Sequence, residues 1–293
     1  MKYVFFGTPD FAARVLGKLV EGGFVPTALV ANPDRPRGRK KILTPPPTKE
    51  LLLARKFPTD ILQPEAIDEG FISKIHGYRP DFFVVTAYSK ILPGAILEVP
   101  ARGALGIHPS LLPKYRGTTP IQSAILGGEK ETGVTIYLLD PKVDHGLTLA
   151  SEKCEIGEYD TYTTLSKKLA DLGGDLLLRI LPSFLDGKLP WVEQDEKAVT
   201  HTKKFFTEDA FIPGGDLKEA LAVGGEKAIA IWRKIRALNP EPGVWTTELA
   251  PYAPKRAKLL EAEISEGKLV LTTIQVEGEK PKRVIANNAN SVK

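Results

Sequence analysis

The chain has 293 residues, which is longer than a typical single domain and suits two. It is 42% hydrophobic and 26% charged, as globular proteins are, and its apolar runs are too short to span a membrane or to form a signal peptide. The single cysteine excludes an internal disulfide and a multi-cysteine metal site, and the net charge of +4 excludes no class of partner. We expect a cytoplasmic protein.

The first half of the chain alternates short apolar runs with helical patterns. Thr8 and Pro9 are typical of a helix start, and the following glycines at 22–23 are typical of a helix end. The patterns predict strands at 3–7, 25–32, 60–64, 81–88, 103–109 and 133–140, and helices at 8–23, 48–56, 68–78 and 119–128. This α/β alternation, with strands that are apolar on both faces, predicts a mostly parallel sheet covered by helices.

The second half of the chain changes character after a long amphipathic helix predicted at 161–187. A polar, irregular stretch at 188–204 is typical of a linker. The region 205–293 holds one helical pattern at 226–238, followed by period-two runs at 243–249, 257–265 and 267–278. We therefore predict a first domain at 1–187, a linker at 188–204, and a small, basic β-barrel or sandwich domain at 205–293.

The sequence lacks the common nucleotide and metal motifs. No Gly-x-Gly-x-x-Gly follows the first strand, there is no P-loop, and there is no His-Glu-x-x-His pattern. We predict neither a dinucleotide site nor a metal site.

A cationic run lies at 34–41, where "DRPRGRKK" carries five basic side chains. These are Arg35, Arg37, Arg39, Lys40 and Lys41. Such a cluster suits a polyanion such as RNA, and it is equally compatible with a solvated surface loop.

Among the four histidines, His108 has the context of a catalytic group. It ends an apolar strand, where a parallel sheet places its ligand crevice, whereas His76 and His201 suit surface or capping positions. Asp144 lies in a later loop and could face His108, orienting the imidazole and favouring its charged form. From spacing alone, a structural role for His108 remains open.

Six segments together resemble the folate-dependent formyltransferases. They are "VFFGTPDFA", "NPDRPRGRKK", "VVTAYSKILP", "HPSLLPKYRGTTPIQ", "TGVTIYLLDPKVDHG" and "IRALNPEPGVWT". Their order and their spread over nearly the whole chain are most similar to the family members that act on methionyl-tRNA. The resemblance implies a Rossmann-like N-terminal domain and a C-terminal β-barrel like an OB-fold.

The resemblance also implies a reaction and a set of roles. The formyl group of 10-formyltetrahydrofolate would pass to the methionine amine of initiator methionyl-tRNA, with His108 stabilising the oxyanion and Asp144 tuning His108 and accepting a proton. The cations of the 34–41 run would contact the tRNA, and the enzyme would be a monomer. Formylfolate would contact two segments: Ser110, Leu111, Leu112 and Pro113 in one, and Thr86, Ala87, Tyr88, Ile91 and Leu92 in the other.

Gly106 departs from the family pattern, which has Asn at this position. Loss of one oxyanion-hole donor typically costs about 100- to 1,000-fold in rate. Another polar group could replace the amide, the enzyme could be slow, or the chain could bind tRNA or folate without turnover. A formyltransferase acting on sugar-nucleotide amines is a further alternative. Restoring Asn at Gly106 is expected to raise the rate unless another group already fills its role.

Overall fold

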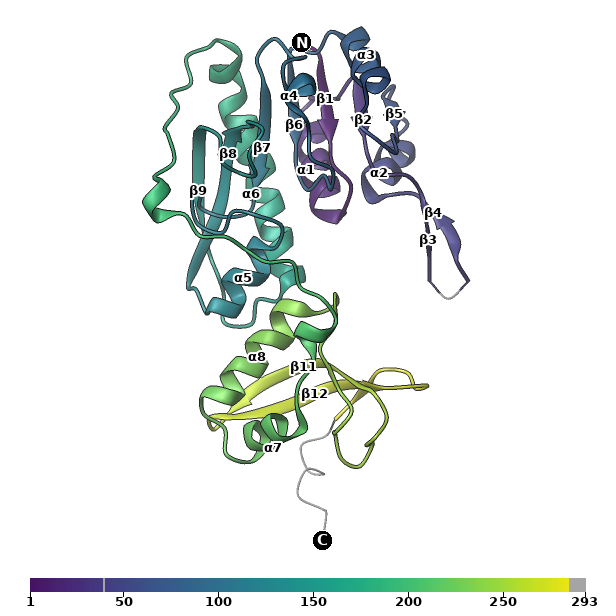
Figure 1. Cartoon of the computed structure of the whole chain (residues 1–293), viewed down its shortest axis with the longest axis vertical. Coiled ribbons are helices and arrows are strands. Elements are labelled where there is room, and N and C mark those ends of the chain that lie inside the picture. Colours follow the sequence, from purple (N-terminus) through teal and green to yellow (C-terminus); the bar gives the residue numbers. More distant parts are fainter. Residues whose placement is uncertain (39, 285–293) are drawn as a thin grey trace. The chain divides into compact units, whose positions relative to one another are not determined.

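The computed structural model describes residues 1–38 and 40–284 (Figure 1). The chain forms two compact units, each discontinuous in sequence. The first comprises 1–117, 131–155 and 166–201, and the second comprises 118–130, 156–165 and the residues from 202 onward. In the described part of the chain, no helix combines the length and apolar character needed to cross a bilayer. The domain boundaries at 187 and 205 stay a prediction.

A seven-stranded sheet forms the centre of the first unit, in the order β5-β2-β1-β6-β7-β8-β9 (Figure 1). The five strands from β5 to β7 are parallel, and β8 and β9 are each antiparallel to the preceding strand in that order. A mostly parallel α/β sheet is confirmed. The seven strands of this sheet are β1 (Tyr3–Phe6), β2 (Ala28–Val30), β5 (Asp60–Leu62), β6 (Phe82–Val85), β7 (Ala104–His108), β8 (Glu131–Leu138) and β9 (Thr148–Glu155).

Strand β9 was not predicted, and its pattern explains why. It lies at the edge of the sheet. From Ser151 to its end, the strand alternates exposed and partly buried residues, such as Glu152, which is partly buried, and Lys153, which is exposed. An edge strand covered on one side lacks the continuous apolar run of the central strands.

Helices pack against the sheet of the first unit. The glycine at 173 of α6 lies close to β7 and β8, since a Cβ there would meet Ile107 Cγ2 at 2.9 Å and Val134 Cγ1 at 3.3 Å. Helix α6 therefore covers the face of β7 that carries Ile107, and the alternate residues Gly106 and His108 point to the other face. The helices of this unit are α1 (Asp10–Glu21), α2 (Pro47–Arg55), α3 (Glu69–Tyr78), α4 (Gly94–Leu97) and α6 (Tyr162–Leu185), and its 3₁₀ turn is η1 (Glu196–Ala198). The first turn of α6 belongs to the second unit.

The cationic run is part of a hairpin rather than a plain loop. Strand β3 (Arg35–Arg37) pairs antiparallel with β4 (Ile42–Thr44), and the hairpin projects beyond the sheet in Figure 1. The exposed side chains of Ile42 and Leu43 leave no buried face to predict these strands from apolar periodicity.

The second unit is built on an antiparallel sheet in the order β10-β11-β12-β13. The predicted helix at 226–238 is found as α8, and the predicted strands at 257–265 and 267–278 are found as β11 and β12. The short helix α7 was not predicted. The elements are α5 (Pro120–Gly127), the 3₁₀ turn η2 (Glu208–Ala210), α7 (Gly214–Ala222), α8 (Glu226–Leu238), β10 (Trp245–Thr246), β11 (Ala257–Ser265), β12 (Lys268–Val276) and β13 (Lys282–Arg283).

Candidate active site

His108 is the last residue of β7, at the carboxyl edge of the parallel strands. Pro109 follows, and it has no N–H with which to extend the ladder. Thr86 follows the neighbouring parallel strand β6, and its hydroxyl donates to the carbonyl oxygen of Ile107 at 3.1 Å. The two strand ends are thereby tied together at the edge where open α/β sheets bind ligands.

The two ring nitrogens of His108 have different surroundings. Nε2 lies 2.9 Å from the carbonyl oxygen of Tyr115, and because a carbonyl only accepts, Nε2 carries a hydrogen. Nδ1 lies 3.6 Å from Oδ2 of Asp144, so a proton on Nδ1 creates an ion pair. Both side chains are largely shielded, with exposures of 7% and 15%.

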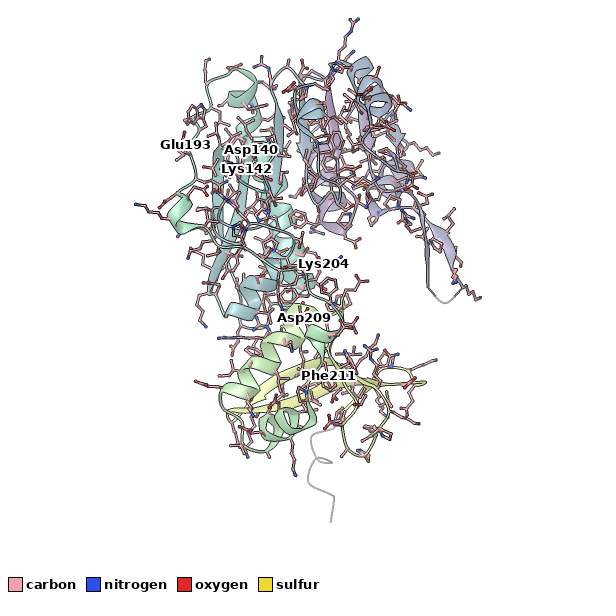
Figure 2. The ribbon with its side chains drawn as sticks, viewed as in Figure 1. Asp140, Lys142, Glu193, Lys204, Asp209 and Phe211 are labelled. Atoms are coloured by element: carbon pink, nitrogen blue, oxygen red, sulfur yellow. The ribbon has the colours of Figure 1, made fainter. Side chains whose placement is uncertain are left out.

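Asp144 reaches His108 by an unexpected route. Because β8 is antiparallel to β7, the end of β8 lies beside the start of β7, where Leu138 is paired with Leu105. The loop after β8, which carries Asp140 and Lys142 (Figure 2), must therefore turn back to bring Asp144 to the opposite end of β7. Asp144 adopts a left-handed backbone conformation with φ of 49°, which is uncommon outside glycine.

Two donors hold the Asp144 carboxylate. The backbone N–H of Gly117 donates to Oδ2 at 2.8 Å, and the hydroxyl of Tyr137 donates to Oδ1 at 2.7 Å. Each oxygen therefore accepts one hydrogen bond. Oδ2 is the oxygen that faces His108.

Gly106 lies on the same face of the sheet as His108, next to the ring of Tyr137. Gly106 and Tyr137 are register partners on β7 and β8. A Cβ at Gly106 would lie 2.3 Å from Cε1 and 2.6 Å from Cζ of that ring, and 2.6 Å from Cδ1 of Leu139. The aromatic ring thus occupies the space that the Asn expected from the resemblance would need. Burial, and then the charge of Asp144, raise the pKa of Tyr137 well above its usual value.

Thr135 holds the turn that follows His108, the first of the predicted folate segments. Its hydroxyl donates to the carbonyl oxygen of Ser110 at 2.8 Å and accepts from the N–H of Leu112 at 3.0 Å. The Ser110 hydroxyl donates to the carbonyl oxygen of Lys114 at 2.6 Å. The structure places Leu111 and Pro113 in the same turn, partly buried.

The second predicted folate segment starts at the end of β6. Ala87 has φ of 46°, Ile91 is 77% exposed and Leu92 is buried. The Tyr88 ring packs edge-on against Phe6, with centroids 5.6 Å apart. Among the described residues, the buried Tyr88 hydroxyl has no hydrogen-bond partner. Burial raises the pKa of Tyr88 to about 12.

The cations predicted to contact tRNA lie on the β3–β4 hairpin. Arg35 is exposed and lies 3.6 Å from Glu65, Lys40 and Lys41 are exposed at the hairpin tip, and Arg37 is the last residue of β3. Arg39 lies outside the described residues.

A polar cluster anchors the base of the hairpin. Lys49 Nζ donates to both oxygens of Asp34 at 2.9 Å. Hydrogen bonds from Gln63 and Lys49 hold the pKa of the Asp34 carboxyl below its usual value. The cluster fixes the point where the hairpin leaves the sheet.

Sequence reasoning missed a clamp on the Asp144 loop, formed by Gln194 and Arg116. The Gln194 amide donates to the carbonyl oxygens of Asp144 at 2.9 Å and Gly146 at 2.8 Å. Its own oxygen accepts from Nε and Nη2 of the buried Arg116, at 3.0 and 2.9 Å. Gln194 lies in the stretch predicted to be a linker, so nothing in its local pattern pointed to the site.

Sequence reasoning also assigned no role to Tyr137. A tyrosine in a strand that also holds two threonines gave no distinctive signal. His145, for which the sequence predicted no role, pairs through Nδ1 with Oδ2 of Asp140 at 2.5 Å. The described residues contain no group of three or more His, Cys, Asp or Glu side chains suited to a metal ion.

Comparison with known proteins identifies the family. The model of the Formyl transferase family matches residues 1–181. The chain is 41% identical over 247 residues to a protein of Halalkalibacterium halodurans named methionyl-tRNA formyltransferase, covering 84% of this chain and 74% of the relative. Among solved structures, methionyl-tRNA formyltransferase from Clostridium thermocellum superposes with a TM-score of 0.59 at 17% identity, covering 94% of this chain and 98% of the other.

A second solved structure, an N-formyltransferase from Helicobacter canadensis in complex with folinic acid and dTDP-3-aminofucose, gives a TM-score of 0.63 at 15% identity. It covers 94% of this chain and 95% of the other. Both structural matches show a shared fold, while the family assignment depends on the sequence matches. The chain therefore belongs to the Formyl transferase family, and within it to the methionyl-tRNA formyltransferases.

Proposed function

We propose that this enzyme transfers the formyl group of 10-formyltetrahydrofolate to the methionine amine of initiator methionyl-tRNA. The observation that carries the proposal is the approach of His108 Nδ1 to Asp144 Oδ2, at 3.6 Å, in a chain 41% identical to a methionyl-tRNA formyltransferase. An imidazole and a carboxylate at the carboxyl edge of a sheet suit acyl transfer, which needs both a proton acceptor and an oxyanion stabiliser.

The chemistry divides between the two side chains. The amine nitrogen forms a bond to the formyl carbon, the carbonyl oxygen becomes an oxyanion, and the bond to the folate nitrogen then breaks. Asp144 accepts the proton lost by the amine, directly or through water. The proton then passes from Asp144 to Nδ1 of His108. The resulting imidazolium stabilises the oxyanion by its charge and supplies a proton to the leaving nitrogen, while the Tyr115 carbonyl fixes the orientation of the ring.

The Tyr88 hydroxyl supports a formylfolate site at the ends of β6 and β7. A buried hydroxyl without a hydrogen bond is costly, and it has no partner among the described residues. The polar ring of formylfolate, bound beside 86–92 and 110–113, would supply a hydrogen-bond partner for this hydroxyl. We propose that Thr86, Tyr88, Leu92 and the turn at 110–113 hold this co-substrate, which supplies the activated formyl group when bound.

The hairpin supports tRNA as the acceptor. Its exposed cations suit phosphates, which position a nucleic acid without reading its sequence. We further propose that 1–187 carries the chemistry, that 188–204 links it to a tRNA-binding region at 205–293, and that the enzyme acts as a cytoplasmic monomer.

Two other functions predict different assay results. A sugar-nucleotide amine as acceptor has support only from structural similarity at 15% identity, which extends to the fold alone. The replacement of Asn by Gly106 supports a binding protein without turnover. A single-turnover assay with enzyme in excess over charged initiator tRNA should yield formyl-methionine. Formylation of a sugar-nucleotide amine instead, or tRNA binding without product, would contradict the proposal.

A further inference from the structure

We infer that Tyr137 is a positioning residue, which holds Asp144 toward His108, and that Gly106 is its steric partner. The inference rests on the proposed function in one respect, the role of Asp144 in formyl transfer. Neither Tyr137 nor its pairing with Gly106 is part of the reaction described above. Three features of the structure support it: the close packing of the pair, the hydrogen bond to Asp144 and the burial of the phenol.

The packing explains why residue 106 is glycine. Cross-strand partners place their side chains on the same face of an antiparallel pair, and the Tyr137 ring lies over Gly106. A Cβ at 2.3 Å from Cε1 and 2.6 Å from Cζ is closer than packed carbon atoms approach. The same Cβ would lie 2.6 Å from Cδ1 of Leu139, so a side chain at 106 would meet two neighbouring side chains. The ring of Tyr137 in this position therefore requires glycine at 106.

The hydrogen bond explains what the ring achieves. Asp144 lies on a returning loop, and its carboxylate is fixed at Oδ2 by the Gly117 N–H and at Oδ1 by the Tyr137 hydroxyl. Two donors on two different oxygens define the plane of a carboxylate, whereas one donor leaves it free to rotate. In this plane Oδ2 faces His108 Nδ1. The Tyr137 hydroxyl thus stabilises the geometry of the acid–base pair.

The burial keeps the hydroxyl a donor. Tyr137 is 6% exposed, and its raised pKa means that the phenol keeps its proton throughout the physiological range. The acidic groups that act on it are Asp144 and Asp140, both of which disfavour a phenolate. A neutral, immobile donor suits a positioning role because it adds no charge of its own to the site.

Tyr137→Phe is the direct test, because it keeps the ring and removes the donor. We expect kcat for formyl transfer to fall about 10- to 100-fold, the effect of losing a hydrogen bond to a charged group. The KM values for both substrates should stay within about twofold. Tyr3→Phe is the matched control: it also removes a buried hydroxyl, which donates to the Phe24 carbonyl at 2.8 Å, and it should leave kcat unchanged. An unchanged kcat in Tyr137→Phe would overturn the inference.

A double-mutant cycle tests whether Tyr137 acts through Asp144. In the Asp144→Asn background, Tyr137→Phe should change the single-turnover rate by less than about twofold, since contacting residues couple. Independent, multiplicative effects of the two substitutions would overturn the positioning role.

The steric pairing has a readout that needs no reaction. Gly106→Ala should lower the thermal unfolding midpoint, and the loss should disappear in the Tyr137→Ala background, where the ring is absent. Gly17→Ala is the control, since the nearest atom to a Cβ there is 3.8 Å away. An equal loss of stability from Gly106→Ala in both backgrounds would contradict the pairing.

Failure of the proposed function is distinguishable from failure of this inference. If the unaltered enzyme forms no formyl-methionine, the proposed function fails. The ¹⁵N NMR signals of the His108 imidazole at fixed pH still report how Asp144 is held. They should differ between the unaltered protein and Tyr137→Phe and be unchanged in Tyr3→Phe. Identical His108 signals in all three proteins would overturn the positioning of Asp144.

Discussion

Nδ1 of His108 lies 3.6 Å from Oδ2 of Asp144, although the strand that precedes Asp144 runs antiparallel to the strand that ends at His108. The contact therefore depends on the returning loop after β8 and on the groups that hold it. Ring orientation at His108 is set separately, by the Tyr115 carbonyl on Nε2. Two independent anchors thus bring one acid–base pair together.

Removing either member of the pair should slow formyl transfer. We expect His108→Ala and Asp144→Asn each to lower kcat by about 100- to 10,000-fold, the usual contribution of general acid–base catalysis. Circular dichroism should show that both variants stay folded. His76→Ala is the control, because His76 is exposed on α3. Activity near that of the unaltered enzyme in either variant would remove that residue from the mechanism.

Restoring the family's Asn at Gly106 should harm this enzyme, which reverses the expectation drawn from the family pattern. The new side chain would need the space of the Tyr137 ring. Overpacking of this kind costs about 1–3 kcal/mol, so Gly106→Asn should unfold at lower denaturant concentration and form product no faster. Urea titration and initial rates check both parts. A variant that is both faster and equally stable would show that the ring moves aside at little cost.

The central strands and His108 could be predicted because they depend on local patterns. Apolar runs such as Phe82–Val85 are buried on both faces, and a histidine at the end of such a run stands out. The hairpin β3–β4 could not be predicted in this way, because exposed strands carry no apolar periodicity.

The remainder of the candidate site depends on contacts between segments distant in sequence. Gln194 and Tyr137 act on Asp144 through hydrogen bonds, and a glutamine in a polar stretch or a tyrosine in a strand has no distinctive sequence pattern. From the sequence alone, glycine in place of the expected Asn at 106 predicts only the loss of a hydrogen-bond donor. Only the strand register shows that Tyr137 lies opposite Gly106 on the neighbouring strand.

Charge reversal at the hairpin tip should weaken tRNA use selectively. We expect Lys40→Glu/Lys41→Glu to raise the KM for methionyl-tRNA at least about tenfold and to reduce its dependence on salt, since fewer phosphate contacts release fewer counterions. The KM for formylfolate should not change. Lys188→Glu is the control, since this side chain is 77% exposed and lies outside the hairpin. Equal weakening of both substrates would contradict a tRNA-specific role.

Loss of the Gln194 clamp should loosen the loop that carries Asp144. Gln194→Ala removes two donors to the carbonyls of Asp144 and Gly146, and it leaves buried Arg116 without the Gln194 oxygen. We expect kcat to fall about tenfold and amide hydrogen exchange to rise in residues 140–146. Faster exchange with unchanged kcat would mean that Tyr137 and Gly117 suffice to hold the carboxylate.

Tyr88 links the proposed co-substrate site to stability at alkaline pH. The pKa of Tyr88 is about 12 in the folded protein and near 10 when unfolded, so the unfolded state loses its proton first as the pH rises. The folded state then binds more protons, and the free energy of unfolding falls between pH 10 and 12. In Tyr88→Phe this fall should be shallower, as measured by urea unfolding across that range.

The same substitution separates stability from binding at pH 7. Because the Tyr88 hydroxyl is buried without a partner among the described residues, Tyr88→Phe should leave the protein at least as stable. If the hydroxyl contacts formylfolate, the KM for that substrate should rise about threefold or more while the KM for tRNA stays the same. Tyr159→Phe, at a position 71% exposed, provides the control for both measurements. An unchanged formylfolate KM, together with a gain in stability, would show that the hydroxyl does not contact the co-substrate.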